Sequence, residues 1–114
     1  MGKAASIAAL AVSLATILLF EAINEAGAAV APTAHTILIE GMRYQPEGLT
    51  VAAGDTVVWV NRDLVPHTAT SASGSFDSNE IAPGKSWTHT VRATGEFTYA
   101  CTYHPLMKAV LRVR

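Results

Sequence analysis

One short segment of the chain carries three side chains that can donate an electron pair to a metal ion. Residues 101–107 read CTYHPLM, so Cys101, His104 and Met107 follow one another at intervals of three. A fourth donor, His67, follows Pro66 in an earlier segment. Together they supply one thiolate, two imidazoles and one thioether. This set predicts a metal site for one-electron chemistry, with two His and one Cys around the ion and Met as a weak axial ligand.

Copper is the metal that this donor set favours. Zinc prefers nitrogen, thiolate or carboxylate donors, whereas a thioether suits copper better. The alternative is a nucleophile–base pair made of Cys101 and His104, but the sequence offers no third group to orient the histidine, and Met107 would have no role. His35 and His89 lack such neighbours in the sequence, and we interpret both as ordinary strand or surface residues.

The spacing also predicts which elements must position the donors. Cys101 ends a run that reads as a strand, so the sheet would fix its place. Two residues then allow the loop to fold back to His104, and two more bring Met107 to the axial side before the last strand. Pro105 stiffens this loop by fixing one φ angle. The opposing wall must come from a separate segment, which Pro66 and His67 supply.

The chain from residue 35 onward reads as short strands separated by glycine and proline. The intervening runs are rich in Val, Thr, Ile and aromatic residues, which favour strands. Alternation is clear where Trp87, His89 and Val91 share one face. We expect strands at residues 35–40, 49–52, 56–61, 68–70, 86–91, 96–101 and 108–114. Short strands at these intervals predict an all-β, antiparallel sandwich.

The first 28 residues read as an export segment rather than as part of the fold. Residues 4–20 contain no charged side chain, Lys3 precedes them, and Ala26 and Ala28 form an A-x-A cleavage pattern. These features predict an apolar N-terminal helix that is removed as a signal peptide after Ala28, or else kept as a membrane anchor. Residues 29–34 then form a linker and residues 35–114 the domain. Either reading predicts a periplasmic or otherwise extracytoplasmic location.

Composition excludes several other classes. The chain has 114 residues, with 8 Lys and Arg against 9 Asp and Glu, a net charge of −1. That length suits one domain, and that balance argues against a nucleic-acid-binding protein, which needs a basic stripe. A single cysteine excludes an intramolecular disulfide framework and a four-cysteine zinc site.

These motifs resemble those of the cupredoxins, the plastocyanin, pseudoazurin and amicyanin group of small blue-copper proteins. The resemblance covers residues 35–114. It rests on five stretches of sequence: GDTVVWVN at 54–61, PHT at 66–68, FDS at 76–78, IAPGKS at 81–86 and GEFTYAC at 95–101. The short spacing between His104 and Met107, and the stretch MRY at 42–44, resemble the amicyanins in particular.

The resemblance implies a Greek-key β-sandwich with one copper ion buried under one end, bound by His67, Cys101, His104 and Met107. It implies a monomer that carries single electrons between redox proteins, which dock transiently on an apolar patch around His104. We expect Pro66, Pro105 and Leu106 to form this patch, with Val65 and Met42 beside them. Relatives commonly have Asn after the first ligand histidine, where this chain has Thr68, so the hydrogen bonds between the two ligand loops must differ.

Two other functions are compatible with parts of this pattern. A copper carrier or buffer could use the same four residues without redox turnover, although carriers usually offer exposed, methionine-rich sites. A copper enzyme would need a second metal centre with more histidines than His35 and His89 provide. We therefore predict that the protein is not an enzyme. We expect contact with a membrane only if the N-terminal segment is uncleaved.

Overall fold

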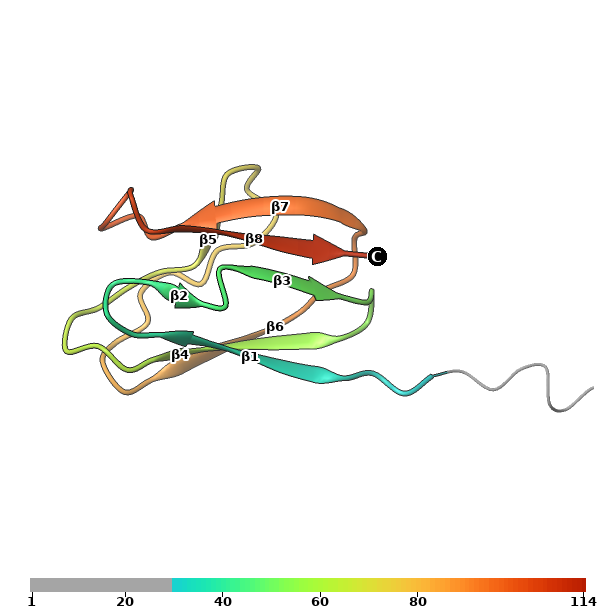
Figure 1. The fold of residues 1–114 in the computed structure, drawn as a ribbon, viewed down its shortest axis with the longest axis horizontal. Coiled ribbons are helices and arrows are strands. Elements are labelled where there is room, and N and C mark those ends of the chain that lie inside the picture. The colour runs from blue at the N-terminus through green and yellow to red at the C-terminus, as the bar shows by residue number, and fades with distance from the viewer. Residues whose placement is uncertain (1–29) are drawn as a thin grey trace, which may run out of the picture. The chain divides into compact units, whose positions relative to one another are not determined.

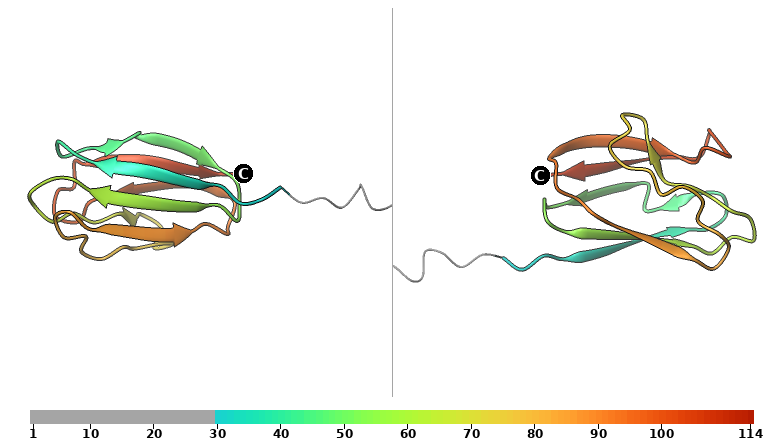
Figure 2. Two further views of the ribbon diagram at one scale, coloured as in Figure 1. Left: turned by 90° about the horizontal axis from the view of Figure 1, so that it is seen from below. Right: turned by 180° about the vertical axis from the view of Figure 1, so that it is seen from behind.

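The computed structural model describes residues 30–114, which form eight β-strands in two facing sheets (Figures 1 and 2). The first sheet has the order β2-β1-β4-β6 and the second β3-β8-β7-β5. The strands are β1 (Ala34–Ile39), β2 (Tyr44–Gln45), β3 (Gly48–Val51), β4 (Thr56–Asn61), β5 (Thr70–Ser71), β6 (Ser86–Thr90), β7 (Gly95–Ala100) and β8 (Lys108–Val113). The all-β sandwich expected from the sequence is confirmed.

The N-terminal predictions concern residues that the structure leaves undescribed. The apolar helix over residues 4–20 and the cleavage site after Ala28 both lie outside residues 30–114. Within the described part of the chain, no helix is long and apolar enough to cross a membrane.

The sheets are mixed, so the prediction of a purely antiparallel sandwich is wrong. β1 runs parallel to β4, and β3 runs parallel to β8, while the other neighbours are antiparallel. The cause is the path of the chain. After β2, the chain crosses to the second sheet for β3 and returns to the first for β4, and such a crossover lets β4 run in the direction of β1.

Most strand bounds agree with the sequence prediction to within one residue, with two exceptions. The strand expected at residues 68–70 is found at Thr70–Ser71, because the backbone N–H of Thr68 is used by the Cys101 sulfur instead of a neighbouring strand. The second exception is β2, which the sequence analysis missed. It has only two residues and ends before Pro46, so it shows no alternation to detect.

The core lies between the sheets and follows the period of two along each strand. Trp59 of β4 is fully buried, and its ring contacts those of Phe76, Trp87 and Tyr99 at centroid distances of 5.7, 5.3 and 5.7 Å. β8 contributes Leu111 to the same core. The loops after β1, β4 and β7 all emerge at one end of this sandwich, away from the C-terminus (Figure 1). The framework thus brings the predicted donor residues to one end.

Candidate metal centre

The loop between β7 and β8 is closed by backbone hydrogen bonds that match its donor spacing. The His104 N–H donates to the Cys101 carbonyl at 3.2 Å, and the Met107 N–H donates to the His104 carbonyl at 2.9 Å. The Cys101 N–H in turn donates to the Met107 carbonyl at 3.1 Å. Each interval of three residues therefore makes one tight turn, and Cys101 and Met107 face each other where the loop leaves and rejoins the sheet.

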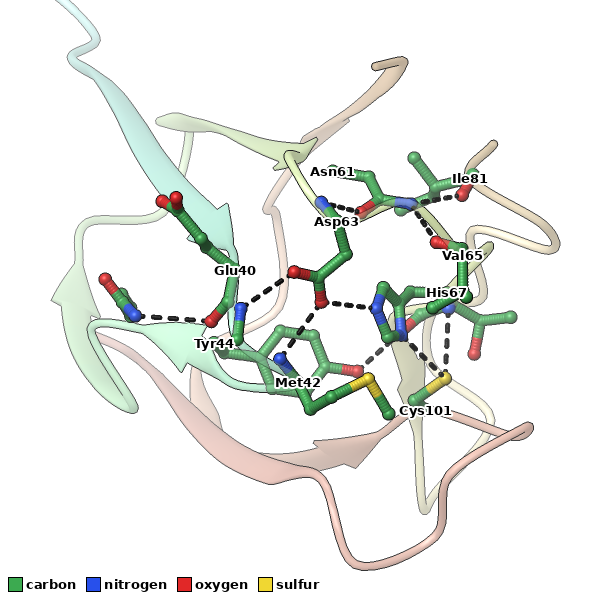
Figure 3. Close-up of polar contacts among 12 residues, drawn as sticks. Glu40, Met42, Tyr44, Asn61, Asp63, Val65, His67, Ile81 and Cys101 are labelled. Carbon is green, nitrogen blue, oxygen red and sulfur yellow. Dashed lines mark hydrogen bonds and ion pairs between the residues drawn. The ribbon is translucent and has the colours of Figure 1, made fainter. Parts of the chain in front are cut away.

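His67 reaches the same place from the loop after β4. Its backbone N–H and carbonyl bond with those of Ile81 at 3.2 and 2.7 Å, which anchors the histidine between two loops. The His67 ring is fully buried, and its Nδ1 lies 3.7 Å from the Cys101 Sγ (Figure 3). Cys101 is also fully buried and free of any disulfide. The structure thus brings the predicted thiolate and imidazole together inside the protein.

His104 lies beside this pair, at the edge of the surface. Its ring centroid is 5.2 Å from that of His67, with an interplanar angle of 61°. His104 is half-buried, whereas Met107 is almost completely buried. Across residues 30–114, no group of three or more His, Cys, Asp and Glu side chains is arranged to hold a metal ion. His67 and Cys101 are therefore the closely paired donors, and ligand roles for His104 and Met107 rest on their chemistry and their shared loop.

Asp63 is a residue of this centre that the sequence analysis missed. Its carboxylate lies 2.8 Å from the His67 Nε2 and accepts backbone N–H groups from Gly41 and Met42 at 2.8 and 3.0 Å (Figure 3). Partial burial opposes ionisation of Asp63, but the N–H groups of Met42 and Gly41 and the contact with His67 outweigh it and lower its pKa. A proton on Nε2 then leaves the Nδ1 lone pair free to face Cys101.

Tyr44 lies beneath the donor residues (Figure 3) and was also missed by the sequence analysis. It is fully buried, its ring packs edge-on against Tyr99 at 4.6 Å, and its hydroxyl donates to the Thr68 carbonyl. Burial raises the pKa of Tyr44, and the nearby Cys101 and Tyr99 raise it further, so the phenol stays protonated and remains a donor. Tyr44 therefore fixes the backbone of the residue that follows His67.

Thr68 links the two donor loops in the place where relatives commonly have Asn. Its N–H donates to the Cys101 Sγ at 3.3 Å, and its Oγ1 accepts the Thr102 N–H at 2.9 Å. The shorter side chain therefore still connects the residue after His67 to the residue after Cys101.

Several apolar side chains in the loops at the donor end (Figure 1) are exposed. Leu106 is 93% exposed and Leu64 is 94% exposed, and both belong to loops that carry a donor. Val65 and Met42 are also exposed, as the sequence analysis expected. Pro105 is exposed and Pro66 is half-buried. Leu64 was not part of the predicted patch. Its position at the tip of the loop between Asn61 and His67 could have indicated that its side chain is exposed.

The two remaining histidines have other partners. The His35 Nε2 lies 2.9 Å from an Asp55 carboxylate oxygen. His89 stacks on Trp87 within β6 at a centroid distance of 5.3 Å, and its partial burial lowers its pKa. Neither contact involves the four predicted donors.

Known proteins share this arrangement of strands and motifs. A cupredoxin-like domain family matches residues 8–113. Amicyanin from Paracoccus versutus is 32% identical over 88 residues, covering 73% of this chain and 67% of its own. Plastocyanin from Tetradesmus obliquus is 32% identical over 72 residues, covering 54% of this chain and 50% of its own.

Solved structures agree with these relatives. A mutant of amicyanin in its Cu(I) form has a TM-score of 0.68 at 30% identity, covering 75% of this chain and 86% of its own. A purple cupredoxin from Nitrosopumilus maritimus has a TM-score of 0.65 at 29% identity, covering 70% of this chain and 99% of its own. A copper-containing nitrite reductase from Thermus scotoductus also matches, at 28% identity and a TM-score of 0.68, over only 24% of its length. With its family match spanning nearly the whole chain, this protein belongs to the cupredoxin-like family.

Proposed function

We propose that this protein is a blue-copper electron carrier with His67, Cys101, His104 and Met107 as the copper ligands. The single observation that carries the proposal is the buried approach of the Cys101 Sγ to the His67 Nδ1, at 3.7 Å. The donor set also includes a thioether, which suits copper and not zinc. Among the relatives, amicyanin and plastocyanin are blue-copper electron carriers.

The side chains of this site fit a copper ion and prepare it for electron transfer. A bound copper ion supplies one-electron chemistry by alternating between Cu(I) and Cu(II). Asp63 orients the His67 ring, and the Thr68 N–H stabilises a thiolate on Cys101. The buried side chain of Met107 keeps water from the inner side of the site. Because backbone hydrogen bonds hold the donor loops in place, His67, Cys101, His104 and Met107 would keep their positions when a bound copper ion changed its oxidation state, which would keep the barrier to electron transfer low.

Electrons enter and leave through His104 and the apolar patch around it, formed by Met42, Leu64, Val65, Pro66, Pro105 and Leu106. The patch combines exposed hydrophobic side chains with the one half-buried histidine of the centre. A small apolar contact suits a carrier that must release its redox partner quickly. The protein acts as a monomer and not as an enzyme.

The chain works outside the cytoplasm. Residues 1–28 serve as a signal peptide or anchor, residues 29–34 as a linker and residues 35–114 as the copper domain. The basic start, apolar run and A-x-A motif support this division.

An absorption spectrum of the purified domain with added Cu(II) tests the proposal. We expect an intense visible band from thiolate-to-copper charge transfer, which Cys101→Ser abolishes. A colourless protein that binds only Cu(I) would instead identify a copper carrier. Unchanged colour in Cys101→Ser would remove Cys101 from the ligand set.

A further inference from the structure

A chain of threonine hydroxyls leads from the donor loops to the surface. The Thr68 Oγ1 lies 3.3 Å from the Thr102 Oγ1 and 3.0 Å from the Thr70 Oγ1. The Thr70 hydroxyl donates to the Asp77 carboxylate at 2.9 Å. Thr68 is buried, whereas Asp77 is exposed. An uninterrupted polar path therefore joins the residues next to His67 and Cys101 to a surface carboxylate.

Asp77 determines which hydroxyl donates and which accepts in each hydrogen bond of this chain, because a carboxylate can only accept. A hydroxyl group has one hydrogen, and Thr70 gives its hydrogen to the carboxylate, so the Thr70 oxygen must accept the hydrogen of Thr68. Thr68 then has none left for Thr102, so the Thr102 hydroxyl donates to Thr68. The Thr68 oxygen accepts this hydroxyl together with the Thr102 N–H, which fills both of its lone pairs.

The carboxylate end of the chain is held in place by the backbone. Thr70 and Asp77 form a β-bridge, and the Ser78 N–H donates to the Ala69 carbonyl at 3.0 Å. Asp77 also accepts the Asn79 N–H at 2.9 Å. The acceptor is therefore fixed without help from the Thr70 side chain, and the loss of that hydroxyl would interrupt the chain without displacing Asp77.

We infer that Thr70 and Asp77 are positioning residues for the metal centre, acting through Thr68. Asp77 holds the Thr70 hydroxyl, Thr70 holds the Thr68 hydroxyl, and Thr68 in turn keeps its N–H on the Cys101 Sγ and its oxygen on the Thr102 N–H. The arrangement exists because this chain has Thr at position 68. Its effect on copper rests on the proposed function, whereas its effect on the loops does not.

Amide hydrogen exchange in the metal-free protein tests the positioning itself. Thr70→Val keeps the side-chain shape but removes the hydroxyl, so Thr68 loses its acceptor and the Thr102 N–H is held less tightly. We expect exchange at Thr102 to accelerate by about fivefold, the effect of losing one hydrogen bond of typical strength. Thr70→Ser, which keeps a hydroxyl, should restore slow exchange. Asp77→Ala leaves the Thr70 hydroxyl as an acceptor for Thr68 but no longer fixes its direction, so it should accelerate exchange less than Thr70→Val does.

The matched control is Thr98→Val, the same change at an exposed threonine of β7. Equal exchange at Thr102 in Thr70→Val and Thr98→Val would overturn the inference, as would a failure of Thr70→Ser to restore it.

The reduction potential of the copper-loaded protein provides a second readout. The positive end of the Thr68 N–H dipole favours the reduced site, which carries more negative charge, so Thr70→Val should lower the potential while Thr70→Ser and Thr98→Val leave it unchanged. An unchanged potential in Thr70→Val would overturn the role at the metal. If the protein forms no blue copper site, the proposed function fails, while hydrogen exchange still decides whether Thr70 and Asp77 position the loops.

Discussion

Asp63 is the residue whose substitution best separates positioning of a ligand from ligation itself. Asp63→Asn removes the charge that pairs with a proton on the His67 Nε2, so the imidazole loses its fixed orientation. Substitutions of such outer partners lower metal affinity by about 10- to 100-fold. We expect a loss of this size in copper affinity, measured by competition with a chelator.

Glu47→Gln is the matched control for Asp63→Asn, because Glu47 is an exposed carboxylate that forms no hydrogen bond with the donor residues. The same loss of charge there should leave copper affinity unchanged. Equal affinities in both variants would mean that Asp63 does not position His67.

The donor residues of the site could be predicted from the sequence more readily than the residues that hold them in place. Cys101, His104 and Met107 could be predicted because each interval of three residues closes a local turn, which a sequence displays directly. Asp63 and Tyr44 could not. Asp63 acts because the turn at Gly41 and Met42 folds onto it, and Tyr44 acts from the missed strand β2. Contacts between segments distant in sequence leave no local pattern.

At the scale of the strands, Asp55 ties the start of the domain to its sheets. Its carboxylate accepts the Thr33 N–H and the Ala52 N–H and contacts His35. The Thr33 N–H, the bond with His35 and the Ala52 N–H lower the pKa of Asp55 from 3.8 to about 2. Because the folded-state pKa is depressed, this stabilisation is present above the unfolded value and is lost as pH falls from 3.8 through about 2.

Urea unfolding at a series of acid pH values measures this dependence. The wild-type midpoint should fall in that acid range, and Asp55→Asn should be less stable at neutral pH but lose less on acidification. An equal loss in the two proteins on acidification would assign the acid sensitivity to other groups, such as Asp63.

The strands themselves could be predicted more reliably than their pairing. Along β8, every second residue faces the core, at Ala109, Leu111 and Val113. This period of two is visible in the sequence, because the charged residues Lys108 and Arg112 occupy positions between them. The parallel pairing of β1 with β4 is not visible, because it depends on β3 joining the opposite sheet. Alternation determines which face of a strand is buried, but it does not determine which strand lies next to it in the sheet.

For the molecule as a whole, the core between the sheets carries the stability. Leu111 of β8 is completely buried, and Leu111→Ala should lower the free energy of unfolding by about 2–5 kcal/mol, the range for a large-to-small core substitution. The same change at Leu64, which is 94% exposed, should cost less than about 0.5 kcal/mol. Similar losses at both positions, measured by urea unfolding, would contradict this assignment of the core.

The exposed leucines at the donor end have a different role from those of the core. Leu106 is 93% exposed, so its apolar surface contributes little to folding and is available for contact with another protein. Under the proposed function, two copper-loaded copies that exchange an electron bring their His104 edges together through this surface. Electron self-exchange, measured by NMR line broadening, therefore reports on the patch without a known partner.

Leu106→Glu should slow self-exchange by about tenfold or more, because the contact loses apolar area and gains two like charges facing each other. The visible absorption should not change, since the Leu106 side chain points to solvent and the loop is closed by backbone bonds. Thr50→Glu adds the same charge at an exposed position of β3 and should leave the rate close to wild type. Because net charge is equal in the two variants, equal slowing in both would show that overall repulsion, and not the patch around His104, controls the encounter.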